Sequence, residues 1–251
     1  MKNLIKVCLV SLLCLGVATG CNQSETEKPV LRMGTSADYK PFQFIDTAIS
    51  DDIIGFDIDI AQYIADELGY ELEVIDMDFN TLTTALRSER VDMVLAGMTP
   101  TPQRREEVDF TDIYYSAQSV LMTLEGVEIN QLEDLNGLNI GVQTGSIQED
   151  AGVALQESGI DVQLTSMDRM PELVQQLIIG RVDAVIIEDM VTPLYLENDE
   201  NLQLIDILEQ THEGSAVAIR YDSELKDQIN EILQQMSENG ELERLSEKWF
   251  N

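Results

Sequence analysis

One short pattern occurs twice in this chain, and it constrains the fold more than any other feature. Residues 86–95 read LRSERVDMVL and residues 177–186 read LIIGRVDAVI, so both fit L-x-x-x-R-V-D-x-V-[LI]. Each copy combines a helix end, a tight turn at Arg-Val-Asp and an apolar run typical of a buried strand. Because the strand–helix–strand surroundings also repeat, the sequence favours two lobes of similar design. One sheet that uses a common βαβ unit twice is the alternative.

The rest of the chain alternates between strand patterns and helix patterns. Residues 56–68 carry apolar side chains at Ile60, Ile64 and Leu68 and are followed by Gly69, which predicts a helix with a defined end. Further helices are expected at residues 82–87, 147–156, 172–179 and 224–249, the last broken near Gly240. Strands are expected at residues 30–33, 72–77, 93–96, 138–142, 162–165 and 184–187. This alternation predicts an α/β fold in which helices flank mostly parallel sheets.

The residues that follow the two repeated strands suggest a binding site. In open α/β sheets, ligands bind beyond the carboxyl ends of the strands. The first copy continues into GMTPT and Arg104, and the second continues into Glu188 and Asp189. Across a cleft, Arg104 could bind a carboxylate through its planar fork and Glu188 could bind an ammonium group, which together would hold a small zwitterion. The alternative is a surface turn on which Arg104 pairs with Glu106 or Glu107.

The N-terminal end of the chain has the pattern of an export signal. It reads MKNLIKVCLVSLLCLGVATGC, in which two lysines precede an apolar run and small residues precede Cys21. We expect a signal over residues 1–20, because the apolar run is too short to span a membrane as a helix. Its removal would take away Cys8 and Cys14, so the exported chain would have no internal disulfide. The polar residues 21–29 would form a tether.

Composition and motifs exclude several classes of function. The chain has 15 Lys+Arg against 47 Asp+Glu, a formal net charge of -32, and nucleic-acid binding instead needs clustered basic residues. The sequence has no P-loop, no Gly-x-Gly-x-x-Gly and no His/Cys/Asp cluster with metal-ligand spacing. The only histidine, His212, favours a surface position over a catalytic one. We therefore expect a protein that is not an enzyme and that needs no cofactor or metal.

Six longer stretches, in the same order along the chain, resemble one protein family. This family is the bacterial extracellular solute-binding proteins of family 3, the polar amino acid receptors of ABC importers. The stretches are GTSADYKPFQF (34–44), GFDIDIAQYIADELG (55–69), MDFNTLTTAL (77–86), AGMTPTPQRREEVDFTDIYY (96–115), IGVQTGSIQE (140–149) and VDAVIIED (182–189). The resemblance covers nearly all of the chain that follows the export signal.

The resemblance implies an architecture, a location and a partner. The fold would be the two-lobed type II fold of periplasmic binding proteins, joined by two crossing strands. Its parts would be lobe 1 at 30–113 and 217–251, lobe 2 at 119–211, and hinge strands at 114–118 and 212–216. The protein would be a monomer that delivers an amino acid to an ABC permease.

The residues before Cys21 resemble a lipoprotein lipobox, although Ala18 stands where Leu or Val is usual. Lipidation of Cys21, including palmitate, would hold the protein on the extracellular face of the cell membrane. In a cell with an outer membrane, that face is periplasmic. Cleavage without lipid and an uncleaved anchor are the alternatives.

The resemblance also implies ligand-binding residues. Arg104 would hold the ligand carboxylate from one lobe, and Ser146 with the backbone N–H of Ile147, at a helix start, would hold it from the other. Glu188 stands where many relatives have Asp for the ammonium group, and its extra methylene moves the carboxylate. Ser36 departs from an Asp that is common in relatives. The full expected set is Ser36, Tyr39, Phe79, Gly97, Met98, Thr99, Arg104, Gln143, Ser146, Ile147 and Glu188.

Arginine is the expected ligand, because GTSADYKPF, MDFN and GSIQE look most like arginine-binding lipoproteins of Gram-positive bacteria. Tyr39 and Phe79 could stack on a planar guanidinium. The expected acceptors for its N–H groups are Ser36, Asp38, Gln143 and Glu149. Glutamine or another polar amino acid is the alternative, since Ser36 carries no charge. A dehydratase of prephenate-like acids on the same fold is the alternative from another class, but acidic substrates fit poorly beside Glu188 and Asp189.

Overall fold

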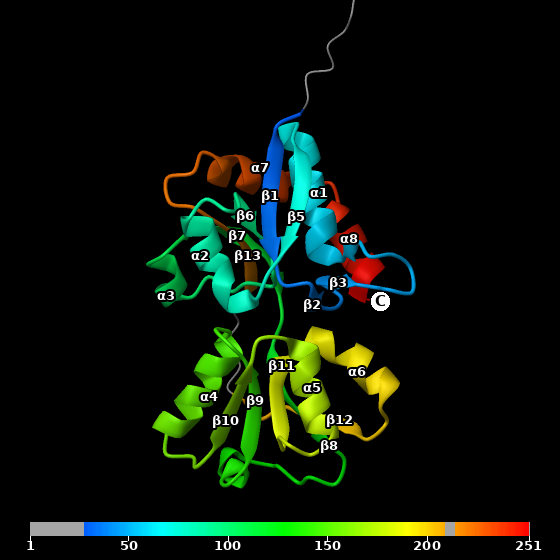
Figure 1. The fold of residues 1–251 in the computed structure, drawn as a ribbon, viewed down its shortest axis with the longest axis vertical. Helices are drawn as coiled ribbons and strands as arrows, with labels where there is room; N and C mark the ends of the chain where they lie inside the picture. Colours follow the sequence, from blue (N-terminus) through cyan, green and yellow to red (C-terminus); the bar gives the residue numbers. More distant parts are fainter. Residues whose placement is uncertain (1–27, 209–213, 251) are drawn as a thin grey trace, which may run out of the picture.

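The computed structural model describes residues 28–208 and 214–250. Within these ranges the chain forms two lobes that lie one above the other, each built on its own five-stranded sheet (Figure 1). The expected export signal, Cys21, His212 and the greater part of the tether lie outside the described residues. Among the helices of residues 28–208 and 214–250, none combines the length and the hydropathy that a membrane span requires.

The sheet of lobe 1 has the strand order β5-β1-β6-β13-β7. Four strands point the same way, because β1 pairs in parallel with β5 and β6, whereas β13 pairs antiparallel with both β6 and β7. Its strands are β1 (Val30–Thr35), β5 (Glu71–Asp76), β6 (Met93–Val94), β7 (Asp109–Ser116) and β13 (Gly214–Ile219). A small second sheet is formed by β2 (Asp38–Tyr39), β3 (Gln43–Ile45) and β4 (Ile53–Ile54).

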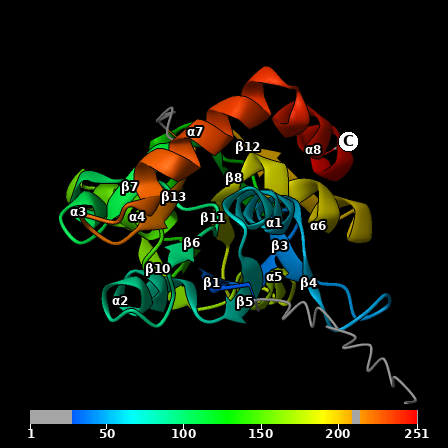
Figure 2. The ribbon, with the colours of Figure 1, turned by 90° about the horizontal axis from the view of Figure 1, so that it is seen from above.

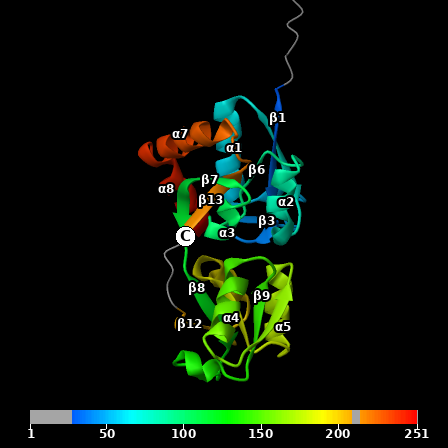
Figure 3. The same ribbon diagram turned by 90° about the vertical axis from the view of Figure 1, so that its left-hand side faces the viewer.

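Helices cover both faces of the lobe 1 sheet. Figures 2 and 3 show α2 on one face and α1, α7 and α8 on the other. These helices are α1 (Phe56–Leu68), α2 (Leu82–Arg87), α7 (Leu225–Glu238) and α8 (Glu241–Phe250), with η1 (Phe79–Thr81) and the short α3 (Pro102–Arg105) in loops. The helix predicted at 56–68 is confirmed with the same bounds, and Gly69 ends it in the left-handed conformation with φ 77°.

Lobe 2 repeats this plan in the order β10-β9-β11-β8-β12. Strands β10 and β11 run parallel to β9, and β8 is antiparallel to its neighbours β11 and β12. The strands are β8 (Ser119–Leu124), β9 (Asn139–Gln143), β10 (Gln163–Met167), β11 (Ala184–Glu188) and β12 (Leu202–Ile205). The helices are η2 (Leu132–Leu135), α4 (Ile147–Glu157), α5 (Met170–Ile178), η3 (Asp189–Val191) and α6 (Thr192–Asn198). The predicted α/β fold with mostly parallel sheets is thus confirmed in both lobes.

The repeated sequence pattern occupies the same place in both lobes. Its strand is β6 in one sheet and β11 in the other, and each is third in the strand order. Asp92 accepts a hydrogen bond from the backbone N–H of Arg32 (2.9 Å), and Asp183 accepts one from the backbone N–H of Asn139 (2.7 Å). Each aspartate therefore ties the turn to the parallel strand beside the repeated one, β1 in lobe 1 and β9 in lobe 2. The two-lobe prediction is confirmed, and the single-sheet alternative is wrong.

The turn before each repeated strand has the same backbone conformation. Glu89 and Gly180, which precede the repeated arginines, have φ values of 60° and 69°. The valines that follow, Val91 and Val182, are buried. A left-handed residue reverses the chain after the helix, so that the valine packs inward and the aspartate faces the neighbouring parallel strand.

The chain crosses between the lobes twice. It leaves the first sheet at the end of β7 and enters the second at β8, with residues 117–118 between them. It returns between β12 and β13, a stretch that includes residues 209–213 outside the description. The lobe and hinge limits predicted from the sequence stay a proposal.

Candidate functional site

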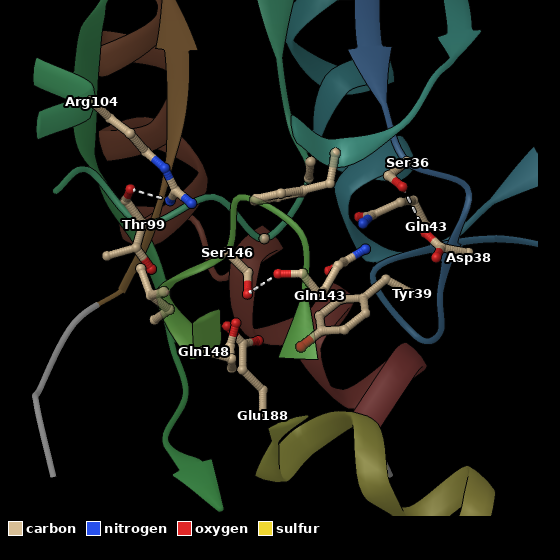
Figure 4. Close-up of a pocket in the computed structure, with 14 residues that line it drawn as sticks. Ser36, Asp38, Tyr39, Gln43, Thr99, Arg104, Gln143, Ser146, Gln148 and Glu188 are labelled. Carbon is tan, nitrogen blue, oxygen red and sulfur yellow. Dashed lines mark hydrogen bonds between the residues drawn. The ribbon is translucent and has the colours of Figure 1, made fainter. Parts of the chain in front are cut away.

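A cavity lies between the lobes, at the carboxyl ends of the central strands (Figure 4). Lobe 1 contributes Ser36, Asp38, Tyr39, Gln43, Phe79, Ala96, Gly97, Thr99 and Arg104, and lobe 2 contributes Gln143, Ser146, Ile147, Gln148 and Glu188. Every residue of the expected set except Met98 therefore lines one cavity.

Arg104 is oriented by both lobes. It lies in α3, whose first turn is capped by the Thr101 side chain, which accepts from the Arg104 backbone N–H (3.2 Å). Its guanidinium donates to the carbonyl of Thr99 (2.7 Å) and to the carbonyl of Gly145 in lobe 2 (2.9 Å). A guanidinium carries five N–H donors, so these two contacts orient it while it can still meet a ligand carboxylate. The surface-turn alternative is not favoured, because Arg104 lines the cavity and Glu107 pairs with Arg87 (3.3 Å).

Gly97 supplies a special backbone conformation to the cavity wall. Its φ is 59°, which only glycine adopts without cost. Its backbone N–H donates to Asp57 (2.8 Å), a fully buried carboxyl that also accepts from the Tyr114 hydroxyl (2.8 Å). The backbone N–H of Gly97 is therefore already bonded within lobe 1. Burial raises the pKa of Asp57 to about 7.

Glu188 brings a buried carboxyl to the cavity from the end of β11. Its side chain lines the cavity, the residue is only 7% exposed, and Oε2 has no hydrogen-bond partner within the described residues. Burial raises the pKa of Glu188 to about 8, and the charges of Asp189 and Asp57 add to this effect, while Tyr39 and Arg104 oppose it. An unsatisfied buried oxygen is costly, so a cationic donor placed here would recover free energy.

The start of α4 lines the cavity with Ser146, Ile147 and Gln148. Ser146 is the N-cap residue, and its hydroxyl donates to the carbonyl of Gln143 (2.7 Å) and accepts from the backbone N–H of Glu149 (3.1 Å). The hydroxyl thus shapes the helix start, and Ile147 follows as the first helical residue. Helix N-termini favour anionic groups, since their first N–H groups have no partner within the helix.

Asp38, which is hydrogen-bonded to Ser36, is a second carboxyl group in the cavity wall. The Ser36 hydroxyl donates to Asp38 (2.7 Å), and the backbone N–H of Met170 in lobe 2 donates to the other oxygen of Asp38 (2.8 Å). Burial raises the pKa of Asp38, whereas the hydrogen bonds from Ser36 and Met170 and the charge of Arg169 lower it. The carboxylate that Ser36 lacks is therefore supplied two residues later, at a position that the sequence interpretation had named as an acceptor.

The aromatic residues Tyr39 and Phe79 line the cavity as expected. Tyr39 stacks on Phe42, with ring centroids 5.8 Å apart. The ring of Phe79 lies under the guanidinium of Arg104, 5.2 Å from its central carbon. One face of the Phe79 ring is thus in contact with the Arg104 guanidinium. A ligand can contact only the rest of this ring.

Some expected contacts lie elsewhere, and others were missed. Met98 does not line this cavity, because its side chain packs in the core beside α2. Glu149 accepts from the backbone N–H of Gly145 (2.7 Å) at the start of α4 and lines a neighbouring groove. Gln43 and Gln148 were not foreseen, since single buried amides leave no pattern in a sequence.

The chain is similar to proteins that bind amino acids. The family profile described as "Bacterial extracellular solute-binding proteins, family 3" matches residues 31–251. The chain is 47% identical over 230 residues to the arginine-binding extracellular protein ArtP of Bacillus subtilis (strain 168), covering 90% of this chain and 88% of that protein.

Two solved structures extend the similarity to the fold. An ancestral arginine-binding protein bound to arginine has a TM-score of 0.83 and 36% identity, over 89% of this chain and 99% of its own. An ancestral arginine-binding protein bound to glutamine has a TM-score of 0.81 and 36% identity, over 89% of this chain and 98% of its own.

Proposed function

Because this chain belongs to the bacterial extracellular solute-binding proteins of family 3, we propose that it binds one polar amino acid between its lobes for an ABC importer. The observation that carries the proposal is that Arg104 of lobe 1 and Glu188 of lobe 2 line the same cavity. A ligand with one carboxylate and one ammonium group can satisfy both only when the lobes are closed. Binding therefore favours the closed form by its differential affinity for that form.

The charges around the cavity favour arginine as the ligand. Arg104 provides one cation, while Glu188 and Asp38 provide two carboxyl groups. Arginine has the opposite set, one carboxylate and two cationic groups, whereas glutamine has one of each. The similarity to an arginine-binding protein of Bacillus subtilis supports the same choice. Glutamine stays the alternative, since a similar ancestral protein is described as bound to it.

Calorimetry on the purified mature protein tests this proposal. We expect tight binding of L-arginine, weaker binding of L-lysine and little displacement of labelled arginine by excess glutamine. If glutamine displaces arginine at equal concentration, the arginine assignment is wrong. The clamp, in which Arg104 holds the ligand carboxylate and Glu188 holds its ammonium group, would still stand. If no amino acid binds, the proposed function fails.

We also propose that the protein acts by binding alone. The family and the reported relatives are binding proteins, so the dehydratase alternative is not favoured. Incubation of the protein with a prephenate-like acid should give no aromatic product. Formation of such a product at a rate proportional to protein concentration would overturn this part of the proposal.

The family and the N-terminal sequence support a location at the cell surface. We propose that residues 1–20 are an export signal and that Cys21 carries the lipid that holds the protein, as a monomer, at the extracellular face of the cell membrane beside its permease. Labelling of cells with radioactive palmitate should mark the wild-type protein but not the Cys21→Ser variant. Equal labelling of the two proteins would exclude lipidation at this residue.

A further inference from the structure

A cluster of charges at the edge of the ligand cavity joins the two lobes. Arg169 precedes α5 in lobe 2, and its guanidinium contacts three carboxylates of lobe 1. Its Nη1 and Nη2 donate to the two oxygens of Asp76 (2.9 and 3.3 Å), and its Nε donates to Asp78 (3.0 Å). Nη1 also lies 3.9 Å from an oxygen of Asp38. The contact with Asp76 is bidentate, the geometry in which arginine binds carboxylates most strongly.

The lobe 1 side of this cluster is held in place by its own lobe. Asp76 ends β5 and accepts a hydrogen bond from the backbone N–H of Ala37 (2.8 Å). Asp38 accepts from the Ser36 hydroxyl (2.7 Å). Lobe 1 thus gathers like charges that repel each other, and Arg169 is the cation that neutralises them when lobe 2 approaches.

The cluster shares one residue, Asp38, with the ligand cavity. Arg169 does not line the cavity, whereas Asp38 does. The backbone N–H of Met170, next to Arg169, donates to Asp38 (2.8 Å). The same carboxylate therefore contacts lobe 2 on one side and the cavity on the other, which places the cluster at the edge of the closed cleft.

We propose that Arg169, with Asp38, Asp76 and Asp78, is a latch that stabilises the closed lobes and so sets how long the ligand stays bound. This inference rests on the proposed function. Opening of the cleft separates Arg169 from all three carboxylates, because they lie on different lobes. The latch therefore contributes free energy to the closed form only, and its loss lowers the closed population.

The side-chain exposures give the size of the effect. The side chain of Arg169 is 25% exposed, and those of Asp76 and Asp78 are 38% and 45% exposed, so water and salt screen these contacts in part. We expect Arg169→Ala to speed ligand dissociation by about tenfold, within the range of strong charge-assisted contacts. High salt should reduce the difference between the variant and the wild type.

The test compares two arginine variants of the purified mature protein, with labelled L-arginine as the probe. Arg169→Ala should raise the dissociation rate and leave the association rate nearly unchanged, and Arg169→Lys should restore part of the loss. The matched control is Arg32→Ala, which breaks an ion pair with Asp92 (2.7 Å) inside lobe 1. The control should dissociate at the wild-type rate. A wild-type dissociation rate in Arg169→Ala would overturn the latch.

A second measurement separates this inference from the proposed function. Fluorescence energy transfer between dyes on the two lobes reports the closed fraction of the ligand-free protein, which should fall in Arg169→Ala. If the wild type binds no arginine while this fraction falls, the proposed ligand is wrong and the latch stands. If arginine binds and neither the closed fraction nor the dissociation rate changes, the latch is wrong and the binding function stands.

Discussion

The two lobes share one framework, but the segments that follow their repeated strands bring opposite charges to the cleft. In lobe 1 the repeated strand β6 leads into a loop that carries Arg104, and in lobe 2 the equivalent strand β11 ends at Glu188. Arg104 is oriented by two carbonyl oxygens, whereas Glu188 keeps an oxygen without a partner in the described structure. The repeat thus sets where the site lies, and the short segments after the strands set which ligand charges it accepts.

The largest expected effect comes from removing the cation of lobe 1. Arg104→Ala should weaken amino acid binding by on the order of a hundredfold or more, because a bidentate charge-assisted contact exceeds about 1.5–3 kcal/mol and each 1.4 kcal/mol is tenfold. Calorimetry against arginine measures the change. Arg105→Ala, on the same short helix, is the matched control and should bind nearly as the wild type does, because Arg105 does not line the cavity. Similar losses in the two variants would contradict the clamp.

Removing the anion of lobe 2 should have a smaller effect. Glu188→Gln keeps the shape of the side chain but cannot form an ion pair with an ammonium group, so affinity should fall by about tenfold, the worth of one charged hydrogen bond. Asp189→Asn is the control, since Asp189 does not line the cavity and accepts from the backbone N–H groups of Gln118 and Met190. A larger loss of affinity in the Asp189 variant than in the Glu188 variant would show that Glu188 does not bind the ammonium group.

The pH dependence of binding should distinguish the two lobes, because Arg104 keeps its charge throughout and Glu188 does not. The pKa of Glu188 is raised to about 8 by burial, so below pH 8 the empty site holds a proton that an ammonium ligand must displace. Affinity should therefore rise with pH up to about 8, by at most about tenfold per pH unit for one proton. Glu188→Gln should flatten this profile, and an unchanged profile in that variant would contradict the assignment.

The stability of the ligand-free protein should change with pH in the opposite direction. A carboxyl whose pKa is raised by folding binds its proton more tightly in the folded state. Its contribution to the free energy of unfolding is therefore complete below its ordinary pKa and is lost as the pH rises toward the pKa of the folded state. Stability should therefore decrease from about pH 5 to pH 8, and less so in Glu188→Gln. Chemical unfolding of both proteins at several pH values measures the difference. Parallel curves would show that Glu188 is not buried as a neutral acid.

The sequence revealed the framework because periodic apolar spacing and the repeated turn follow from local chemistry. The helix at 56–68 and the strands around both copies of the repeat were predictable for this reason. The details of the cavity were not. Asp57 looks like an ordinary acid in the first turn of a helix, and only the folded structure brings it to the N–H of Gly97. Met98 lies between two cavity residues, but neighbouring side chains in a loop can point to opposite sides, and this one enters the core.

The smallest expected effect tests the framework itself. Asp92 and Asp183 make the same contact with the parallel strand beside their own, β1 or β9, so Asp→Ala at either position should destabilise the protein by about 1 kcal/mol. Asp92 also pairs with the Arg32 guanidinium (2.7 Å), and the resulting hydrogen bonds lower the pKa of Asp92 despite partial burial. Because this ion pair is partly exposed, it adds at most about 1 kcal/mol.

Urea unfolding at neutral pH should therefore rank the Asp92 variant as slightly less stable than the Asp183 variant, and the difference should shrink at high salt. The reverse order would mean that the turn contributes differently to stability in the two lobes, although both copies read Arg-Val-Asp.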